Sequence, residues 1–190
     1  MYEILEYTQI DKAEVVEFSQ QASLYTEDPA HKNMISLPHL LYESDRLKNN
    51  NGTYYFLKIN GTIEIGSGVY ISDFDKHIAI GGLRSWVNEE YRGKFLIGTY
   101  LLPKQLKWAE DCNLKIFAIT LNDYNLKYLS YFRRSGLGLK KDRKPGRVFY
   151  NGQYEVEFPC NIRGVKQHVL YHKIDKSYNP NWKKIRWQYK

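Results

Sequence analysis

A strand that leads directly into a basic, glycine-containing turn and then into a helix is the feature of this sequence that most restricts its fold. An apolar run ends at Val87, the turn Arg92-Gly93-Lys94 follows, and a helical pattern begins immediately after it. This order directs backbone N–H groups and the positive end of a helix dipole to one place. We therefore predict a binding site for a phosphate or pyrophosphate at residues 92–99.

Composition and charge are those of a globular protein with anionic partners. The chain has 190 residues, of which 43% are hydrophobic and 26% are charged, as expected for one folded domain. Its 17 tyrosines suit a β-rich protein with aromatic surfaces. The net charge of +7 favours nucleotide cofactors, nucleic acid or membrane surfaces as partners.

Cysteine usage and hydropathy lead us to expect a cytoplasmic protein. The two cysteines, Cys112 and Cys160, are too few for a disulfide scaffold and match no metal-binding spacing. The first residues lack the basic and apolar regions of a secretory signal, and no apolar stretch approaches the roughly 20 residues that cross a bilayer. The five histidines form no ligand motif, so we expect neither a metal ion nor a membrane partner.

Turn signals and apolar periodicity predict alternating strands and helices. The Asn60-Gly61 pair separates two β-rich runs, residues 53–59 and 62–71, and is the strongest short-range signal for a β-hairpin. The predicted order is one strand, two helices, three strands, a helix, a strand, a helix and two strands. This order predicts an α+β fold with a mixed, mostly antiparallel central sheet and helices on both faces.

Two helices can be placed from their ends and apolar faces. Asp11 is in position to cap a helix, with Glu14 three residues later as its capping partner. The helix after the basic turn has an apolar stripe and is expected to run to about residue 112. That stripe consists of Leu101, Leu102, Leu106 and Ala109.

Three features between Ile78 and Gly136 follow the pattern of one known family. Val87 lies five residues before Arg92, as in the pattern Val-x-x-x-Tyr-Arg-Gly-Lys, and the next helix has an apolar start. A later segment begins a helix at Asn122 to Asn125, which ends in Tyr131-Phe132-Arg133-Arg134-Ser135-Gly136-Leu137. Over residues 1–175 the chain resembles the GNAT superfamily of acyl-CoA-dependent N-acyltransferases.

The resemblance implies a single GNAT-like domain over residues 1–175, with residues 176–190 as a basic, aromatic tail packed on it. In the family, the strand that corresponds to the one ending at Val87 splays from its neighbour. The pantetheine arm of acetyl-CoA, or of another short acyl-CoA, lies in the gap, and the loop binds the pyrophosphate. The resemblance assigns cofactor binding to Trp86, Val87, Arg92, Gly93, Lys94, Phe95, Leu96, Ile97, Gly98, Thr99, Asn122 and Asn125.

The cofactor loop departs from the family pattern. The family loop is commonly Arg-x-x-Gly-x-Gly, whereas the segment from Arg92 to Gly98 is one residue longer. Phe95 or Leu96 therefore stands where a glycine is expected. Cofactor binding requires these bulky side chains to point away from the ligand.

The position of the catalytic tyrosine also differs. Seven residues after Asn125, the family's tyrosine is replaced by Phe132, and Tyr131 lies about 100° around the helix from it. Phenylalanine cannot donate a proton to the departing thiolate. Either Tyr131 is the catalytic residue, or water or another group protonates the thiolate, or the protein binds without catalysis.

The acceptor side offers several acidic side chains. An amine must be neutral to attack a thioester, and a carboxylate or a relayed water often takes its proton. Glu64 on the predicted hairpin could face the acceptor, whereas Glu89 and Glu90 are expected on a solvated turn near the site. Residues 24–47 and 150–168 are expected to line the acceptor side.

We therefore predict a GNAT-type N-acyltransferase that moves an acetyl or other short acyl group to a primary amine by direct attack in a ternary complex. Two alternatives stay open. Phe132 and the altered loop suggest a non-catalytic acyl-CoA-fold binding module. The basic segment 133–147 and the aromatic tail suggest an acyltransferase-like enzyme that acts on nucleic acid.

Overall fold

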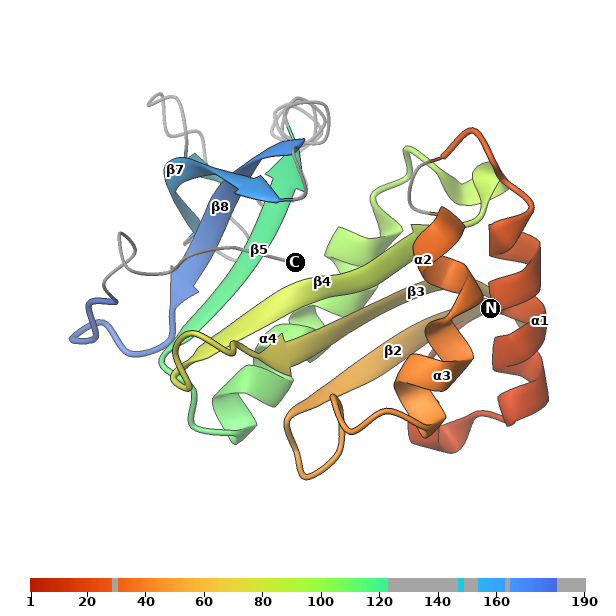
Figure 1. The fold of residues 1–190 in the computed structure, drawn as a ribbon, viewed down its shortest axis with the longest axis horizontal. Coiled ribbons are helices and arrows are strands. Elements are labelled where there is room, and N and C mark those ends of the chain that lie inside the picture. Colours follow the sequence, from red (N-terminus) through yellow and green to blue (C-terminus); the bar gives the residue numbers. More distant parts are fainter. Residues whose placement is uncertain (29–30, 123–146, 149–153, 163–164, 181–190) are drawn as a thin grey trace. The chain divides into compact units, whose positions relative to one another are not determined.

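Two compact units make up the chain, and strand β4 contributes to both. The computed structural model describes residues 1–28, 31–122, 147–148, 154–162 and 165–180 (Figure 1). The first unit comprises Met1–Ile71 and Gly81–Cys112, and the second comprises Ser72–Ile80 and Asn113–Lys190. The predicted domain boundary at residue 175 stays a prediction.

The first unit contains four adjacent strands and the helices that pack on them. Its strands lie in the order β1 (Tyr2–Glu6), β2 (Gly52–Ile59), β3 (Thr62–Ile71) and β4 (Ile78–Val87). Its α-helices are α1 (Lys12–Ser23), α2 (His31–Ile35), α3 (Leu37–Tyr42) and α4 (Leu102–Asp111). The described part of this unit also contains two 3₁₀-helices, η1 (Tyr7–Gln9) and η2 (Glu89–Tyr91), and a π-helix, η3 (Ile97–Leu101).

Local signals in the sequence account for the ends of these elements. Asn60 and Gly61 have φ angles of 53° and 91°, the left-handed values that a tight turn between β2 and β3 requires. Asp11 caps α1, because its Oδ1 accepts a hydrogen bond of 2.8 Å from Ala13 N. The predicted hairpin and the capping role of Asp11 are confirmed, whereas Glu14, the predicted capping partner, forms an ion pair with Lys58.

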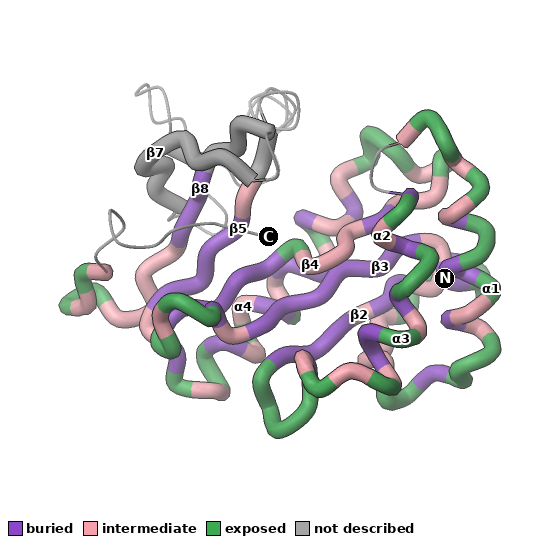
Figure 2. Tube along the Cα trace, viewed as in Figure 1, coloured by how far each residue is buried: buried purple, intermediate pink, exposed green. Residues whose placement is uncertain are grey.

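Helices cover both faces of the first unit's strands, as predicted. Ile65 and Gly66 are neighbours on β3 and therefore face opposite sides of the sheet. A Cβ on Gly66 would lie 3.2 Å from the Phe18 ring of α1, which marks one face. Ile65 packs with Leu101 of η3 on the other face. Figure 2 shows the buried residues that follow β2, β3 and β4 between these layers.

Aromatic side chains fill the face under α1. Tyr54, Phe56 and Phe18 are almost completely buried, with ring centroids 4.9 Å apart for Tyr54–Phe56 and 5.7 Å for Phe18–Phe56. The hydroxyl of Tyr54 donates a 2.8 Å hydrogen bond to the carbonyl of Arg84, so this core also holds β4. Burial raises the pKa of Tyr54 far above its usual range, and the hydroxyl stays protonated.

The second unit carries the strands that follow β4. Their order is β4, β5 (Ile116–Asn122), β8 (Val165–Lys173), β7 (Tyr154–Ile162) and β6 (Arg147–Val148). The β4–β5 pair is parallel and joins Ile78–Ile80 of β4 to residues 116–118. The β5–β8, β7–β8 and β6–β7 pairs are antiparallel. The predicted mixed, mostly antiparallel sheet of an α+β protein is confirmed.

No helix in the described part of the chain combines the length and the apolar character needed to cross a membrane.

Candidate functional site

The predicted cofactor loop begins where β4 ends, within the first unit. Trp86 is buried and Val87 is half-buried at the end of β4. After η2 the chain turns at Gly93, whose φ of 78° lies in the left-handed region. Nothing lies within 4 Å of the place that a Cβ on Gly93 would take, so the backbone is open to an approaching group there. The exposed Lys94 follows, with its Nζ 4.9 Å from the centroid of the Tyr91 ring.

Apolar anchors fix the start of the helix behind this loop. Leu96 and Leu101 are buried in one cluster with Leu57, Ile59 and Ile65 of the sheet. Thr99 N donates to Phe95 O at 3.1 Å, so the amides that this helix start leaves without a carbonyl of its own are those of residues 96–98. In η3 the hydrogen bond from Leu102 N to Ile97 O spans five residues, a π-type widening that is frequent at functional sites.

Phe95, one of the two residues that stand where the family pattern has a glycine, takes a left-handed backbone conformation. Its φ is 56°, in the left-handed region that glycine enters without strain. Its ring lies against Gly98: a Cβ on Gly98 would be 2.3 Å from two ring carbons. Leu96, the other residue in the position of the missing glycine, points into the core. Gly98 therefore makes room for the half-buried Phe95 ring.

The side chain of Arg92 is held by the protein itself. Its Nε donates a 3.0 Å hydrogen bond to Val87 O, and its Nη2 lies 3.4 Å from Asp28 Oδ2. The guanidinium carbon lies 4.9 Å from the Trp86 ring centroid and 5.4 Å from that of Tyr25. We call this set, Arg92 with Val87 O, Asp28, Trp86 and Tyr25, the Arg92 clamp. It ties the segment after α1 to the end of β4.

The loop fits an anionic group such as the pyrophosphate of an acyl-CoA. The backbone is accessible at Gly93, a helix begins directly after the loop, and Lys94 adds an exposed positive charge. The residues that bring these properties together are local in sequence, which is why the sequence predicts them.

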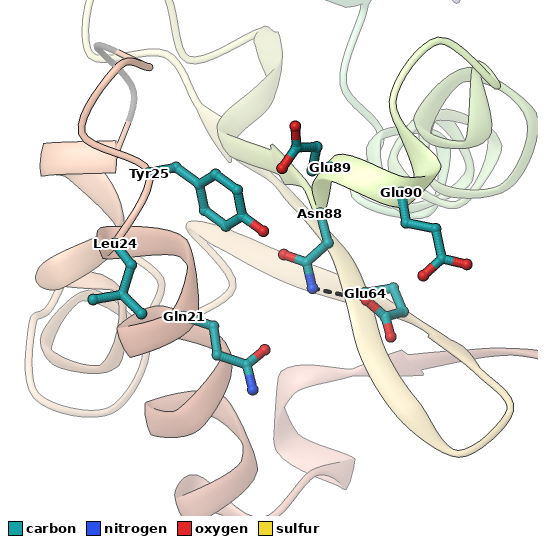
Figure 3. Close-up of a pocket in the computed structure, with 7 residues that line it drawn as sticks. All are labelled: Gln21, Leu24, Tyr25, Glu64, Asn88, Glu89 and Glu90. Atoms are coloured by element: carbon teal, nitrogen blue, oxygen red, sulfur yellow. Dashed lines mark hydrogen bonds between the residues drawn. The ribbon is translucent and has the colours of Figure 1, made fainter.

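A cavity of about 390 Å³ is lined in part by Glu89 and Glu90 of η2, the segment that leads into this loop (Figure 3). Its walls come from the end of α1, from β3 and from the segment that leads into the cofactor loop. They are formed by Gln21, Leu24, Tyr25, Glu64, Asn88, Glu89 and Glu90. Leu24 and Tyr25 fall in the range 24–47 that was predicted to line the acceptor side.

Asn88 links Glu64 to the end of β4. Trp86 Nε1 donates to Asn88 Oδ1 at 3.0 Å, and Asn88 Nδ2 donates to Glu64 Oε2 at 2.7 Å. The backbone N–H of Asn88 also donates to Glu64 O at 3.0 Å. Asn88 was not among the predicted site residues, because the contact joins positions 24 residues apart and no local pattern marks it.

Three carboxylates, those of Glu64, Glu89 and Glu90, lie at the cavity wall, and the Arg92 guanidinium lies beside its Tyr25. Partial desolvation, with the nearby carboxylates of Glu90 and Glu64, raises the pKa of Tyr91. Glu89 and Glu90 are exposed on η2, in agreement with the expected solvated turn. Within the described residues, no three His, Cys, Asp or Glu side chains gather as a metal-binding group.

A buried polar network supports β4 beside the site. Gln105 of α4 is completely buried; its Nε2 donates to Ser67 Oγ at 2.8 Å, and its Oε1 accepts from Gly82 N at 3.2 Å. Ser67 also shares a 2.7 Å hydrogen bond with Ser85. Gln105 lies next to Leu106 of the predicted apolar stripe, yet Leu106 is only half-buried. The hydropathy pattern therefore did not predict the burial of Gln105.

The predicted cofactor residues divide between the two units. Trp86, Val87 and residues 92–99 come together in the first unit, and Asn122 is the last residue of β5 in the second. Asn125, Tyr131 and Phe132 lie outside the described residues. The predicted gap beside β4 and the role of Tyr131 stay predictions.

Comparisons with known proteins identify the fold. No protein-family model and no curated protein matches the sequence. Among solved structures, the ribosomal-protein-alanine N-acetyltransferase of Brucella melitensis is 11% identical with a TM-score of 0.60, over 90% of this chain and 99% of that one. A Salmonella typhimurium protein solved with acetyl-CoA is 15% identical with a TM-score of 0.55, over 96% and 99%. A chimeric spermidine N-acetyltransferase from Vibrio cholerae is 13% identical with a TM-score of 0.53, over 90% and 95%.

These likenesses define the class: an α+β fold of the acetyltransferase type. The chain has the GNAT fold, as its sequence motifs predict. At identities of this size, the likeness concerns the fold.

Proposed function

We propose that the protein is a GNAT-type N-acyltransferase that transfers an acetyl or other short acyl group from acyl-CoA to a primary amine. The proposal depends on one arrangement: the basic turn Arg92-Gly93-Lys94 and an acid-lined cavity both adjoin η2 in the same unit. The first suits the phosphates of an acyl-CoA, and the second suits an amine. The GNAT fold and the acetyl-CoA bound to a solved structure of that fold support the same reading.

The chain's own groups would hold acyl-CoA at the end of β4. Bound acyl-CoA would supply the thioester that is consumed in the reaction. The open backbone at Gly93, the amides of the first helical turn and the Lys94 ammonium would bind the pyrophosphate. By resemblance, Trp86 and Val87 would offer backbone groups to the pantetheine arm, and Asn125 would bond it from the other side.

The cavity would hold the acceptor amine, and a carboxylate at its wall would accept the proton of the amine. Alkylamines are protonated at neutral pH and must lose a proton before they can attack a carbonyl carbon. Glu64, Glu89 and Glu90 supply carboxylates at the cavity for this purpose. Most of the rate would come from holding the amine against the thioester.

Acetyl-CoA titration by calorimetry tests the cofactor site. We expect wild-type protein to bind with a Kd near the micromolar range, and Lys94→Glu to weaken binding by about tenfold or more, because it reverses an exposed charge beside the pyrophosphate. Dephospho-CoA serves as a ligand control. Absence of binding up to millimolar acetyl-CoA would contradict the proposal.

Two further variants show what the Arg92 clamp contributes. Arg92→Ala should weaken acetyl-CoA binding by about tenfold. Asp28→Asn breaks the ion pair to Arg92 but keeps the positive charge. If the charge of Arg92 meets the phosphates, Asp28→Asn should bind acetyl-CoA at least as tightly as the wild type. If the clamp acts by ordering the loop, both variants should lose affinity.

Thiol release in the presence of an amine panel then separates transfer from binding alone. Amine-dependent release supports the acyltransferase. Acetyl-CoA binding without release for any amine would favour the non-catalytic binding module. A salt-dependent affinity for DNA or RNA would favour the enzyme that acts on nucleic acid.

A further inference from the structure

We propose that Glu64 is the carboxylate that binds the ammonium group of the acceptor, and that Asn88 is the residue that positions it. The acceptor is then a primary alkylamine, either a free amine or a lysine side chain. This inference rests on the proposed function and assigns the substrate class of the same site.

Glu64 presents a fixed but incompletely satisfied carboxylate to the cavity. It is half-buried on β3 and forms part of the cavity wall (Figure 3). Its Oε2 accepts the 2.7 Å hydrogen bond from Asn88 Nδ2. Among the residues that the structure describes, no side chain donates to its Oε1 and no Lys or Arg forms an ion pair with it. An ammonium group, with its three N–H donors, matches this unused acceptor.

Asn88 holds Glu64 in one orientation. Its side-chain amide is itself fixed by the 3.0 Å hydrogen bond from the indole N–H of Trp86, which is only 2% exposed. Its backbone N–H donates to the carbonyl of Glu64 at 3.0 Å. The two residues are therefore joined by one hydrogen bond between their backbones and one between their side chains. A carboxylate held in this way loses little freedom when a cation binds, which favours affinity.

The remaining walls suit the carbon chain of an alkylamine. Leu24 and Tyr25 supply apolar surface on the wall formed by the end of α1, and the cavity of about 390 Å³ is within the usual size of small-molecule sites. Arylamines are neutral at pH 7 and form no ion pair with a carboxylate. The site therefore discriminates in favour of amines that arrive charged.

Glu64 is expected to contribute more than the other two acids of the cavity. Glu89 and Glu90 are exposed on η2, where water and salt screen an ion pair. Glu64 is shielded on one side by the sheet, and its charge is oriented by Asn88. Charge-assisted hydrogen bonds of this kind are among the stronger polar interactions in proteins.

Direct amine binding gives a test that does not depend on catalysis. The probes are 1,5-diaminopentane and Nα-acetyl-lysine amide, titrated calorimetrically into wild-type protein and Glu64→Gln. We expect Glu64→Gln to raise the Kd of both probes by about tenfold or more, the loss of one charge-assisted hydrogen bond. The two probes distinguish a free diamine from a lysine side chain as the preferred source of the amine. Aniline should bind wild type and Glu64→Gln equally.

Glu3→Gln is the matched control, because Glu3 lies exposed on β1 and the substitution removes the same charge. Its amine affinity should equal that of the wild type. Asn88→Ala leaves the Glu64 charge in place but removes the bond that orients it, so KM for the amine should rise severalfold while kcat at saturating amine changes less. The Kd for acetyl-CoA should stay within about twofold of the wild type in Glu64→Gln and Glu3→Gln.

Unchanged amine affinity in a folded Glu64→Gln protein overturns the proposal, and so does an equal loss in Glu3→Gln. Thermal unfolding of each variant shows whether it is folded. If Glu64→Gln is not folded, the KM of Asn88→Ala for the amine tests the proposal, and an unchanged KM overturns it. Failure of the proposed function has a different signature: acetyl-CoA does not bind and no thiol is released, whereas the amine titrations still give their own result.

Discussion

Replacing Gln105 with alanine is expected to lower the free energy of unfolding by about 3 kcal/mol. The side chain is completely buried between α4 and the sheet, so its removal leaves a cavity there. It also leaves Ser67 without its 2.8 Å hydrogen-bond donor and Gly82 N without its acceptor. Urea unfolding with linear extrapolation measures the loss.

Gln105→Met separates the two parts of this effect. Methionine has a similar volume but cannot replace the hydrogen bonds, so we expect about half of the loss seen for alanine. Lys104→Ala, at the exposed neighbouring position on α4, is the control and should change stability by less than about 0.5 kcal/mol. A loss below about 1 kcal/mol for Gln105→Ala would show that the network contributes little to the fold.

Gly98→Ala is expected to destabilise the protein by about 2 kcal/mol, because the new Cβ would lie 2.3 Å from carbons of the Phe95 ring. The φ of Gly98 is not in the left-handed region, so the ring, and not the backbone conformation, requires glycine here. Thermal or urea unfolding of Gly98→Ala measures the effect. The same variant should disturb the start of η3 and weaken acetyl-CoA binding.

The sign of this effect should reverse when Phe95 is replaced by glycine. Without the ring, alanine at position 98 meets no obstacle and is favoured over glycine in a helix by up to about 1 kcal/mol. In the Phe95→Gly background, Gly98→Ala should therefore be neutral or stabilising. An equal loss in both backgrounds would contradict the assigned role of Gly98. The double-mutant cycle measures the coupling directly.

The sequence predicted those parts of the fold that depend on neighbouring residues. Asn60-Gly61 specifies a tight turn by its left-handed conformation, and Asp11 caps α1 through a bond two residues away. The order of strand, basic turn and helix around Val87 likewise depends on local patterns. From these elements the class of fold follows, because few layer arrangements accommodate them.

The contacts that shape the site could not be predicted in this way. Arg92 meets Asp28 and Tyr25 from a segment more than sixty residues earlier, and no periodicity in the sequence indicates that pairing. Gln105 is buried because its amide satisfies Gly82 and Ser67, although hydropathy places glutamine on a surface. Phe95 departs from the glycine pattern of the loop. Its ring packs against Gly98, and the sequence does not indicate that contact.

If both proposed ligands bind, the Arg92 clamp gives a route for thermodynamic coupling between them. Tyr25 is both a wall of the cavity and a partner of the Arg92 guanidinium, and Arg92 opens the loop proposed for the phosphates. An anion that draws the guanidinium away from Asp28 changes the support of Tyr25, and an amine that packs on Tyr25 changes the support of Arg92. Linkage then requires each ligand to alter the affinity of the other by the same factor. One arginine side chain would thus couple the two affinities, whichever ligand binds first.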